Sequence, residues 1–427
     1  MRRVEPAHAL VGHIAVPGDK SISHRAVLLA AVAEGETLIR GFGRSGDTES
    51  TLRAVRLLGA EAVDEEVDVV RVRGVGLRGL RSPGEPIDCG NAGTLIRLLA
   101  GLLAGQDGRF ELTGDESLRR RPMERIAEPL RSMGATVETT EGRPPIAIEG
   151  GALSGVSWRM PVASAQVKSC VLLAGLFAEG ATTVFEPAAT RDHTELMLEA
   201  AGARVVRRPG SVTVRGADRI VLGEVDVPGD FSSAAPFAVG AALLAESELA
   251  VHGLGLNPTR TGLLDALERM GGRITVFNRR RAATEIVGDL EVHHAPLVAT
   301  SVPPGEVPRL IDELPLFALA SASARGESVV RGAAELRAKE SDRIETVTEA
   351  LRAIGGRVTA TMDGFRVRGV PTRLRGGTVE SKGDHRIAMF GAVAGVASRQ
   401  GVELEGEQAA AISFPGFYDL LDQVAQR

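Results

Sequence analysis

The sequence predicts an α/β protein of two domains, an inside-out α/β barrel made of six βαβαββ repeats, three in each domain. Three observations support this prediction. An apolar helix followed by a short strand recurs at intervals of 71, 73, 68, 80 and 72 residues. An amphipathic helix recurs between these helices, and its first five copies each end at a glycine. The tetrapeptide Val-Pro-Gly-Asp occurs twice, 211 residues apart, in a chain of 427 residues.

The first helix of each repeat is rich in Ala, Leu and Val and opens on polar residues. Because it is apolar on nearly every side, we expect it to be buried. A short strand follows each copy, for example Glu-Thr-Leu-Ile-Arg-Gly at 36–41. The copies begin near Lys20, Asn91, Ser164, Ser232, Asp312 and Asp384. This pattern predicts a bundle of buried helices with the sheets packed outside it.

The second helix of each repeat is amphipathic and is expected at a surface. A glycine after its last turn leads directly into a strand, which is typical of a left-handed residue that ends a helix. The sixth copy, around Phe417–Gln426, ends the chain. The glycines of the other five copies are Gly59, Gly134, Gly202, Gly271 and Gly355.

The two Val-Pro-Gly-Asp segments, at 16–19 and 227–230, predict the places where the chain passes between domains. Residues 1–16 and 230–427 would form a discontinuous domain, and residues 17–229 an inserted domain. Pro17 and Pro228 suit extended crossings, and Gly18 and Gly229 are expected to supply the turns.

Composition excludes several classes of function. The net charge of −5 and a pI near 6.0 argue against a nucleic-acid or membrane-surface binder. No secretory signal is recognisable, and no apolar run is long enough to span a bilayer. The only cysteines, Cys89 and Cys170, have no metal-binding or redox spacing and suit a reducing cytoplasm. We therefore expect a cytoplasmic protein that binds no metal.

Lysine is scarce, since 46 of the 50 basic side chains are arginine. The four lysines are Lys20, Lys168, Lys339 and Lys382. One explanation is codon bias with chance survivors. The other is that lysine remains where a compact ammonium is needed close to a reacting atom, because a planar guanidinium cannot replace it there. All four lie in dense polar segments. Lys20 and Lys339 favour the second explanation, because Lys20 opens an apolar helix and Lys339 lies in the densest cluster of alternating charge; for Lys168 and Lys382 both explanations remain open.

Polar residues gather where the apolar helices begin. Lys20, Ser21 and Arg25 open the first, and Asn91, Gly93 and Thr94 the second. Ser164 and Gln166 open the third, Asp312 the fifth, and Asp384 and Arg386 the sixth. Capping alone explains the hydroxyls and carboxylates, but not the lysine, arginines and glutamine. Exposed N–H groups and the helix dipole attract anions, so we expect an interdomain cleft that binds phosphates or carboxylates.

Four charged motifs add to this site. They are Arg119-Arg120-Arg121, Arg191-Asp192-His193, Lys339-Glu340-Ser341-Asp342-Arg343 and Asp312-Glu313. A carboxylate held at the mouth of a buried helix near cations is a candidate general base. The pattern predicts a reaction of two anionic reactants with proton transfer by Lys, Asp and Glu. No nucleophilic triad, phosphate-binding Walker loop or dinucleotide fingerprint is present.

Five segments together resemble the 5-enolpyruvylshikimate-3-phosphate synthase family. They are PGDKSISHR at 17–25, GNAGT at 90–94, SAQ at 164–166, RAKESDR at 337–343 and DHRIAM at 384–389. The resemblance implies transfer of the enolpyruvyl group of phosphoenolpyruvate to the 5-hydroxyl of shikimate 3-phosphate, with release of phosphate. It also implies two domains that close on the substrates, no cofactor, a monomer, and inhibition by glyphosate.

The resemblance assigns residues to each substrate. For shikimate 3-phosphate they are Lys20, Ser21, Arg25, Ser164, Gln166, Arg191, Asp312 and Lys339. For phosphoenolpyruvate they are Lys20, Asn91, Gly93, Arg121, Gln166, Arg343 and Arg386. Asp312 would accept the hydroxyl proton, Glu340 would take part in proton transfer to the methylene carbon, and Lys20 would face the reacting bridge.

Two positions depart from the pattern of some family members. Ala165 replaces a serine, and Ile412 replaces a lysine that contacts phosphoenolpyruvate. The sister family that uses UDP-N-acetylglucosamine is the alternative, but it typically has Lys-Asn in place of Lys20-Ser21 and a reactive loop cysteine. A non-catalytic anion-binding scaffold would tolerate loss of Asp312 and Glu340, yet both are present.

Overall fold

The computed structural model describes all residues, 1–427. The chain divides into two units, with boundaries at Pro17/Gly18 and Val227/Pro228. The inserted unit contains Gly18–Val227 together with the short segment Ala282–Glu285. The discontinuous unit contains Met1–Pro17, Pro228–Arg281 and Ile286–Arg427. Each unit has its own hydrophobic core.

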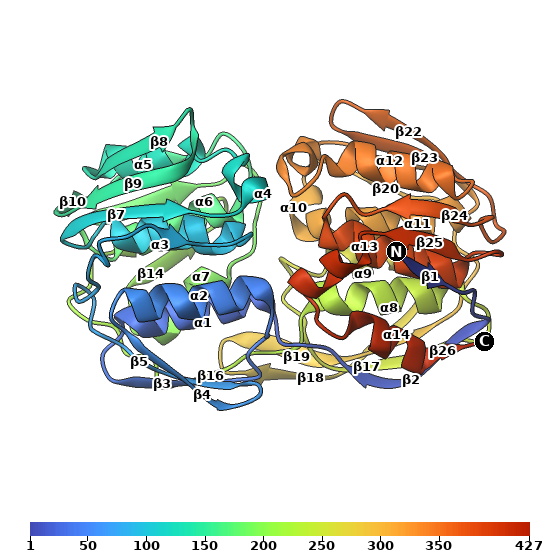
Figure 1. Ribbon diagram of the computed structural model, residues 1–427, viewed down its shortest axis with the longest axis horizontal. Helices are drawn as coiled ribbons and strands as arrows, with labels where there is room; N and C mark the ends of the chain where they lie inside the picture. Colours follow the sequence, from blue (N-terminus) through green and yellow to red (C-terminus); the bar gives the residue numbers. More distant parts are fainter. The chain divides into compact units, whose positions relative to one another are not determined.

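The inserted unit contains three four-stranded sheets of one topology (Figure 1). In each sheet an edge strand pairs parallel to a second strand, and the other two strands form a hairpin antiparallel to it. In spatial order, the sheets are β16 (Glu224–Asp226), β3 (Glu36–Arg40), β5 (Val69–Arg73), β4 (Glu61–Glu66); β6 (Ile87–Asp88), β7 (Gly108–Thr113), β9 (Arg143–Gly150), β8 (Thr136–Thr140); and β11 (Ser157–Arg159), β13 (Ala181–Phe185), β15 (Ser211–Arg215), β14 (Val205–Arg208). A short parallel pair joins β10 (Leu153–Ser154) to β12 (Ala178–Glu179).

The discontinuous unit repeats this topology. In spatial order, its sheets are β20 (Ser301–Val302), β21 (Gly326–Val330), β23 (Gly364–Gly369), β22 (Arg357–Thr361); β18 (Arg273–Ala282), β19 (Glu285–His293), β17 (Glu248–Gly255), β2 (Ala9–Ala15), β26 (Ala425–Gln426); and β1 (Arg2–Val4), β25 (Val402–Glu405), β24 (Gly377–Glu380). The last sheet has three strands because β26, at the end of the chain, pairs with β2 instead.

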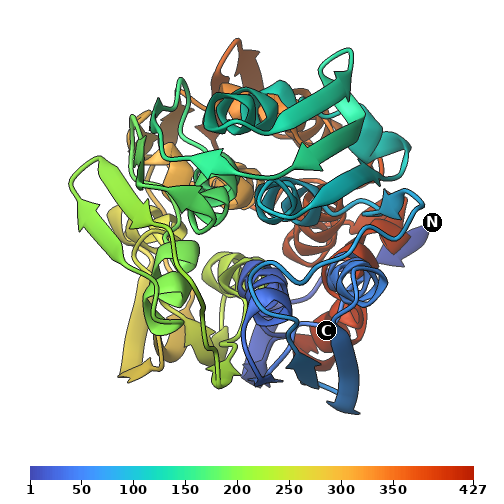
Figure 2. The same ribbon diagram turned by 90° about the vertical axis from the view of Figure 1, so that its left-hand side faces the viewer.

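Six helices are buried on nearly every side, as the sequence predicts. They are α1 (Lys20–Val32), α3 (Gly93–Leu103), α6 (Ala165–Gly175), α8 (Phe231–Leu243), α11 (Leu314–Ser323) and α13 (His385–Ala397). In the inserted unit α3 packs against both α1 and α6, and in the discontinuous unit α8, α11 and α13 pack against one another. Figure 2 shows the sheets of the inserted unit lying outside its helices. The predicted inside-out α/β fold with two domains is confirmed.

The second helices begin and end near the predicted positions. They are α2 (Gly46–Leu57), α5 (Glu124–Met133), α7 (His193–Ala200), α9 (Gly262–Arg269), α12 (Arg343–Ala353) and α14 (Phe417–Val424). The glycine after each of the first five is left-handed, with φ of 100° at Gly59, 109° at Gly134, 87° at Gly202, 84° at Gly271 and 96° at Gly355. This conformation is costly for any residue with a Cβ atom.

Short helical segments complete the chain. They are α4 (Glu116–Arg119), α10 (Val307–Leu310), and the 3₁₀ turns Ile311–Glu313, Ala334–Ala338 and Glu407–Ile412. Asp312 therefore lies in a 3₁₀ turn immediately before α11, rather than in the helix itself.

One detail of the crossings differs from expectation. Gly18 and Gly229 were expected to supply turns, but each lies in an isolated β-bridge rather than in a turn, and neither has a positive φ. At Gly18 the requirement is space, because a Cβ atom there would lie 1.8 Å from the carbonyl oxygen of Gly41. Asp19 and Asp230 instead begin α1 and α8 as N-caps, accepting hydrogen bonds from the backbone N–H groups of Ile22 and Ser232.

Alanine substitutions at the two ends of α2 test the left-handed C-terminus. A Cβ atom at Gly59 or at Gly46 would meet no atom within 4 Å, so packing is not involved at either position. Gly59→Ala is expected to lower the free energy of unfolding by about 1 kcal/mol because of backbone strain alone. Gly46→Ala, in the first turn, is the control and is expected to be neutral or slightly stabilising. Equal losses in urea unfolding would contradict this explanation.

Candidate active site

Lys20 is the first residue of α1, directly after the capping residue Asp19. Its Nζ donates to Oδ2 of Asp47 at 2.8 Å, and the lysine side chain is mostly buried. Asp47 lies in the first turn of α2, so two neighbouring helices fix the ammonium group. The pair brings a compact cation to the N-terminal end of a buried helix, where anions are favoured.

Arg25 lies one turn further along α1 and is 3% exposed. Its Nε donates to Oγ1 of Thr194 at 2.7 Å, Nη2 to Oγ of Ser169 at 3.0 Å, and Nη1 to the carbonyl oxygen of Ser21 at 2.9 Å. Burial lowers the pKa of Arg25 to about 10, despite the carboxylates of Glu195 and Asp19. The hydrogen-bond partners are neutral, so a bound anion would stabilise this guanidinium.

The start of α3 is linked to the start of α6. Gln166 accepts a hydrogen bond from Nη1 of Arg97 at 2.6 Å and donates to Oγ1 of Thr94 at 2.9 Å. Ser164 caps α6 by accepting from the N–H of Val167. Arg97, which sequence reasoning missed, is 7% exposed in an otherwise apolar helix. A charged residue within such a helix is the sequence signal that could have identified it.

Arg121 and Asn91 meet beside Gly93. Nη2 of Arg121 donates to Oδ1 of Asn91 at 2.6 Å, and Asn91 donates to Oδ2 of Asp115 at 2.7 Å. A Cβ atom at Gly93 would lie 2.8 Å from Nη1 of Arg121 and 3.1 Å from Nη1 of Arg97. The absence of a side chain at Gly93 therefore leaves room for two guanidinium groups at one helix N-terminus.

In the discontinuous unit, three cations surround Asp312. Oδ1 of Asp312 lies 3.2 Å from Nη1 of Arg343 and 3.5 Å from Nζ of Lys339, and Oδ2 lies 3.9 Å from Nη1 of Arg260. The neighbouring carboxylate, Glu313, is fully buried and pairs with Arg260 at 3.1 Å. Asp312 is thus the more accessible carboxylate of the pair.

Arg343, at the start of α12, is the most highly paired guanidinium of the site. It is 1% exposed and lies 2.8 Å from Asp384 and 2.6 Å from Glu340. Burial acts to lower the pKa of Arg343, but Asp384, Glu340 and Asp312 more than offset it and raise the pKa above its ordinary value. This network brings Glu340 and Asp312 onto one guanidinium.

Arg386 lies in the first turn of α13, which Asp384 caps. It is 8% exposed, and its Nη1 donates to the carbonyl oxygen of Ser232 at 3.2 Å. The start of α8 and the start of α13 are therefore joined, in the same way as α3 and α6 in the inserted unit.

The predicted site residues thus form one set in each unit. At helix starts of the inserted unit lie Lys20, Ser21, Gly93, Ser164 and Gln166, with Asn91 just before α3 and Arg25 one turn into α1. Arg121 lies between α4 and α5, and Arg191 precedes Asp192, the N-cap of α7. Asp312, Lys339, Glu340, Arg343 and Arg386 lie together in the discontinuous unit. Sequence reasoning missed the supporting partners Asp47, Arg97 and Arg260.

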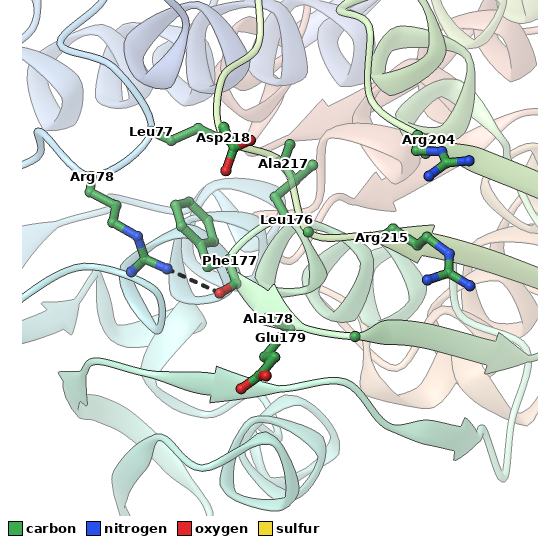
Figure 3. A pocket seen from close by; sticks show the side chains of 12 residues that line it. Leu77, Arg78, Leu176, Phe177, Ala178, Glu179, Arg204, Arg215, Ala217 and Asp218 are labelled. Atoms are coloured by element: carbon green, nitrogen blue, oxygen red, sulfur yellow. Dashed lines mark hydrogen bonds between the residues drawn. The ribbon is translucent and has the colours of Figure 1, made fainter.

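A cavity of about 700 Å³ in the inserted unit lies elsewhere (Figure 3). Leu176 and Phe177, which follow the C-terminal end of α6, form part of its wall. Arg78 donates to the carbonyl oxygens of Phe177 at 3.1 Å and Gly105 at 2.9 Å. No predicted site residue lines this cavity, and Ser164 and Gln166 lie at the opposite end of α6.

Comparisons with known proteins show the family of the chain. Residues 4–421 match the family model described as EPSP synthase (3-phosphoshikimate 1-carboxyvinyltransferase). The chain belongs to this family. A 3-phosphoshikimate 1-carboxyvinyltransferase of Synechococcus sp. is 48% identical, covering 99% of this chain and 96% of the relative. One of Alkalilimnicola ehrlichii is 49% identical, covering 98% of this chain and 94% of the relative.

Two solved structures agree with this chain in fold. EPSP synthase from Acinetobacter baumannii has a TM-score of 0.87 at 42% identity, covering 99% of this chain and 97% of that one. The enolpyruvyl transferase NikO from Streptomyces tendae has a TM-score of 0.80 at 20% identity, covering 99% and 96%, and shows the fold alone. No helix of the structure is long and apolar enough to cross a bilayer.

His24, between Lys20 and Arg25 on the site side of α1, makes stability depend on pH. Its Nδ1 lies 2.6 Å from Oγ1 of Thr51, and its buried Nε2 has no hydrogen-bond partner. Burial, together with the charges of Lys20 and Arg25, holds the pKa of His24 well below its ordinary value. Below pH ~6.5, His24 binds a proton in the unfolded state but stays neutral in the folded state.

We therefore expect the free energy of unfolding to fall as the pH drops through ~6.5, by at most about 1.4 kcal/mol per pH unit from His24. Urea unfolding of the ligand-free protein between pH 8 and pH 5 measures this slope. His24→Asn should flatten it, whereas the exposed control His8→Asn should not. An unchanged slope in His24→Asn would contradict the assignment.

Proposed function

We propose that this protein transfers the enolpyruvyl group of phosphoenolpyruvate to the 5-hydroxyl of shikimate 3-phosphate and releases phosphate. The observation that carries the proposal is the cluster of Asp312 with Lys339, Arg343 and, through Arg343, Glu340. The cluster combines a carboxylate base, a second carboxylate and two cations. The family of the chain, EPSP synthase, supports the same function. The proposed role is in the shikimate pathway, which leads to chorismate and the aromatic amino acids.

Arginine and lysine side chains hold the two anionic substrates. For shikimate 3-phosphate, Arg25 supplies a guanidinium whose protein partners are all uncharged, which suits a phosphate. The other proposed contacts of this substrate are Lys20, Ser21, Ser164, Gln166, Arg191, Asp312 and Lys339. The proposed contacts of phosphoenolpyruvate are Lys20, Asn91, Gly93, Arg121, Gln166, Arg343 and Arg386.

Proton transfer accompanies addition. Glu340 delivers a proton to the methylene carbon of phosphoenolpyruvate, which makes the adjacent carbon electrophilic. The 5-hydroxyl oxygen bonds to that carbon while Asp312 accepts the hydroxyl proton, and a tetrahedral ketal results. Carboxylates near the cationic centre stabilise it electrostatically, and Lys20 lies beside the reacting bridge.

Elimination completes the reaction. The new methyl group returns a proton to the carboxylate of Glu340, the bond from the ketal carbon to the phosphate oxygen breaks, and phosphate leaves as the enol double bond is restored on the product. Both steps are acid–base and addition–elimination chemistry, so the proposal includes no cofactor.

The finer properties of the protein are part of the proposal. We propose that it works as a cytoplasmic monomer and that glyphosate inhibits it. No observation favours UDP-N-acetylglucosamine as the acceptor. Cys89 and Cys170 are both buried, and burial raises the pKa of each thiol, so neither is a reactive loop cysteine.

Phosphate release tests the reaction and the base. Release from phosphoenolpyruvate is expected with shikimate 3-phosphate, and not with UDP-N-acetylglucosamine or without an acceptor. Asp312→Asn should lower kcat by about 10³-fold, in the range of general-base catalysis. Asp265→Asn, which breaks an exposed pair with Arg309, is the matched control and should leave kcat unchanged. Folded protein that releases no phosphate with any acceptor would overturn the function.

Glyphosate inhibition tests the phosphoenolpyruvate pocket. We expect inhibition that competes with phosphoenolpyruvate. Gly93→Ala should weaken the inhibition and raise the KM for phosphoenolpyruvate, because its Cβ atom would displace the guanidinium groups of Arg121 and Arg97. Steady-state kinetics over a range of glyphosate concentrations measures both effects. A response of the wild-type protein that stays flat up to millimolar glyphosate would refute the prediction.

A further inference from the structure

A cluster of three charged side chains lies inside the inserted unit and takes no direct part in the proposed chemistry. Lys168 of α6 is 1% exposed, and Glu195 of α7 is fully buried. Nζ of Lys168 lies 2.7 Å from Oε1 of Glu195 and 3.1 Å from Oε2 of Glu186. Burying Lys168 and Glu195, with the Glu186 side chain mostly buried beside them, is expensive, and a buried ion pair is weak evidence for stability alone. The cluster therefore calls for a functional explanation.

The cluster holds the segment that carries Arg191. Nζ of Lys168 donates to the carbonyl oxygen of Thr190 at 3.3 Å. Oε2 of Glu186 accepts from the backbone N–H of Thr190 at 3.1 Å and from its Oγ1 at 2.7 Å. The backbone donor, backbone acceptor and hydroxyl of Thr190 are thus all bound by the cluster. Because Arg191 is the next residue, the contacts that hold Thr190 also restrict the position of the Arg191 backbone.

The same two helices also hold Arg25. Its guanidinium donates to Ser169, the residue after Lys168, and to Thr194, the residue before Glu195. The two hydroxyl oxygens lie 2.7 Å apart, so α6 and α7 meet there. Separation of α6 from α7 would therefore disturb the hydrogen bonds of Arg25 and the backbone before Arg191 together.

We infer that Lys168, Glu186 and Glu195 form a positioning cluster. This cluster holds Arg25 and Arg191 in the positions that bind the phosphate of shikimate 3-phosphate. The inference rests on the proposed function, because it takes those two arginines as phosphate contacts. Burial raises the pKa of Glu195, and the Lys168 ammonium opposes that rise. In its charged form, Glu195 acts to raise the pKa of Arg25 against the effect of burial.

Binding measurements on Glu195→Gln test the inference, because the substitution keeps the shape and removes the charge. Titration calorimetry compares shikimate 3-phosphate with shikimate, which lacks the phosphate. The expected result is roughly a tenfold rise in the Kd for shikimate 3-phosphate, with little change for shikimate. KM for shikimate 3-phosphate should rise while kcat at saturation stays close to that of the wild type, as expected for lost binding.

Further variants separate positioning from folding. Glu138→Gln, which breaks an exposed pair with Arg109 in the same unit, is the matched control and should change neither Kd. Lys168→Met leaves two buried carboxylates without their cation and can fail to fold, in which case Glu195→Gln alone decides. If it folds, Lys168→Met and Glu195→Gln together should lose less affinity than the sum of the single losses.

Three outcomes are decisive. Unchanged affinity of Glu195→Gln for shikimate 3-phosphate, with an active wild-type protein, overturns the positioning role and leaves the proposed function intact. Equal losses for shikimate 3-phosphate and shikimate overturn it too, since they would indicate general loosening. A wild-type protein that binds neither compound and releases no phosphate overturns the proposed function itself.

Discussion

Six helices buried on nearly every side carry many of their polar side chains at or near their N-terminal ends. The bodies of α8, α11 and α13 are apolar. The first turns of α8 and α13 carry Ser232 and Arg386, and the Asp312–Glu313 pair lies in the 3₁₀ turn directly before α11. The N-terminal ends of such helices expose N–H groups and the positive end of the dipole. The way these helices are buried therefore determines where the charged side chains lie. The positive ends of the helix dipoles also make these places favourable for bound anions.

The two sets of site residues carry their charge differently. Arg25 is held by hydroxyls and a carbonyl, and its lowered pKa shows that the protein stabilises its charge only weakly. Arg343 is held by three carboxylates, and its pKa is raised. The first arrangement leaves a cation for a ligand anion to pair with. The second keeps two carboxylates, Asp312 and Glu340, ordered for proton transfer.

Charged residues inside the bundle occur in complementary groups. Lys168 pairs with Glu186 and Glu195, and Arg260 pairs with Glu313. A single buried charge would be costly, whereas a paired one fixes the geometry of the helices that supply it. In both units these groups lie next to a proposed substrate contact. The fold thus has buried charged groups where the position of an arginine or a carboxylate matters for the proposed function.

The sequence by itself determined the six repeats, the buried and amphipathic helices, the left-handed glycines and the family. These follow from local patterns, because periodicity and capping depend on residues a few positions apart. Only the tertiary structure decided that Asp47 pairs with Lys20, that Arg97 binds Gln166, and that Gly18 is needed for space rather than for a turn. Those contacts join residues 23 to 69 positions apart, and one sequence carries no local signal for which side chains meet across packed helices.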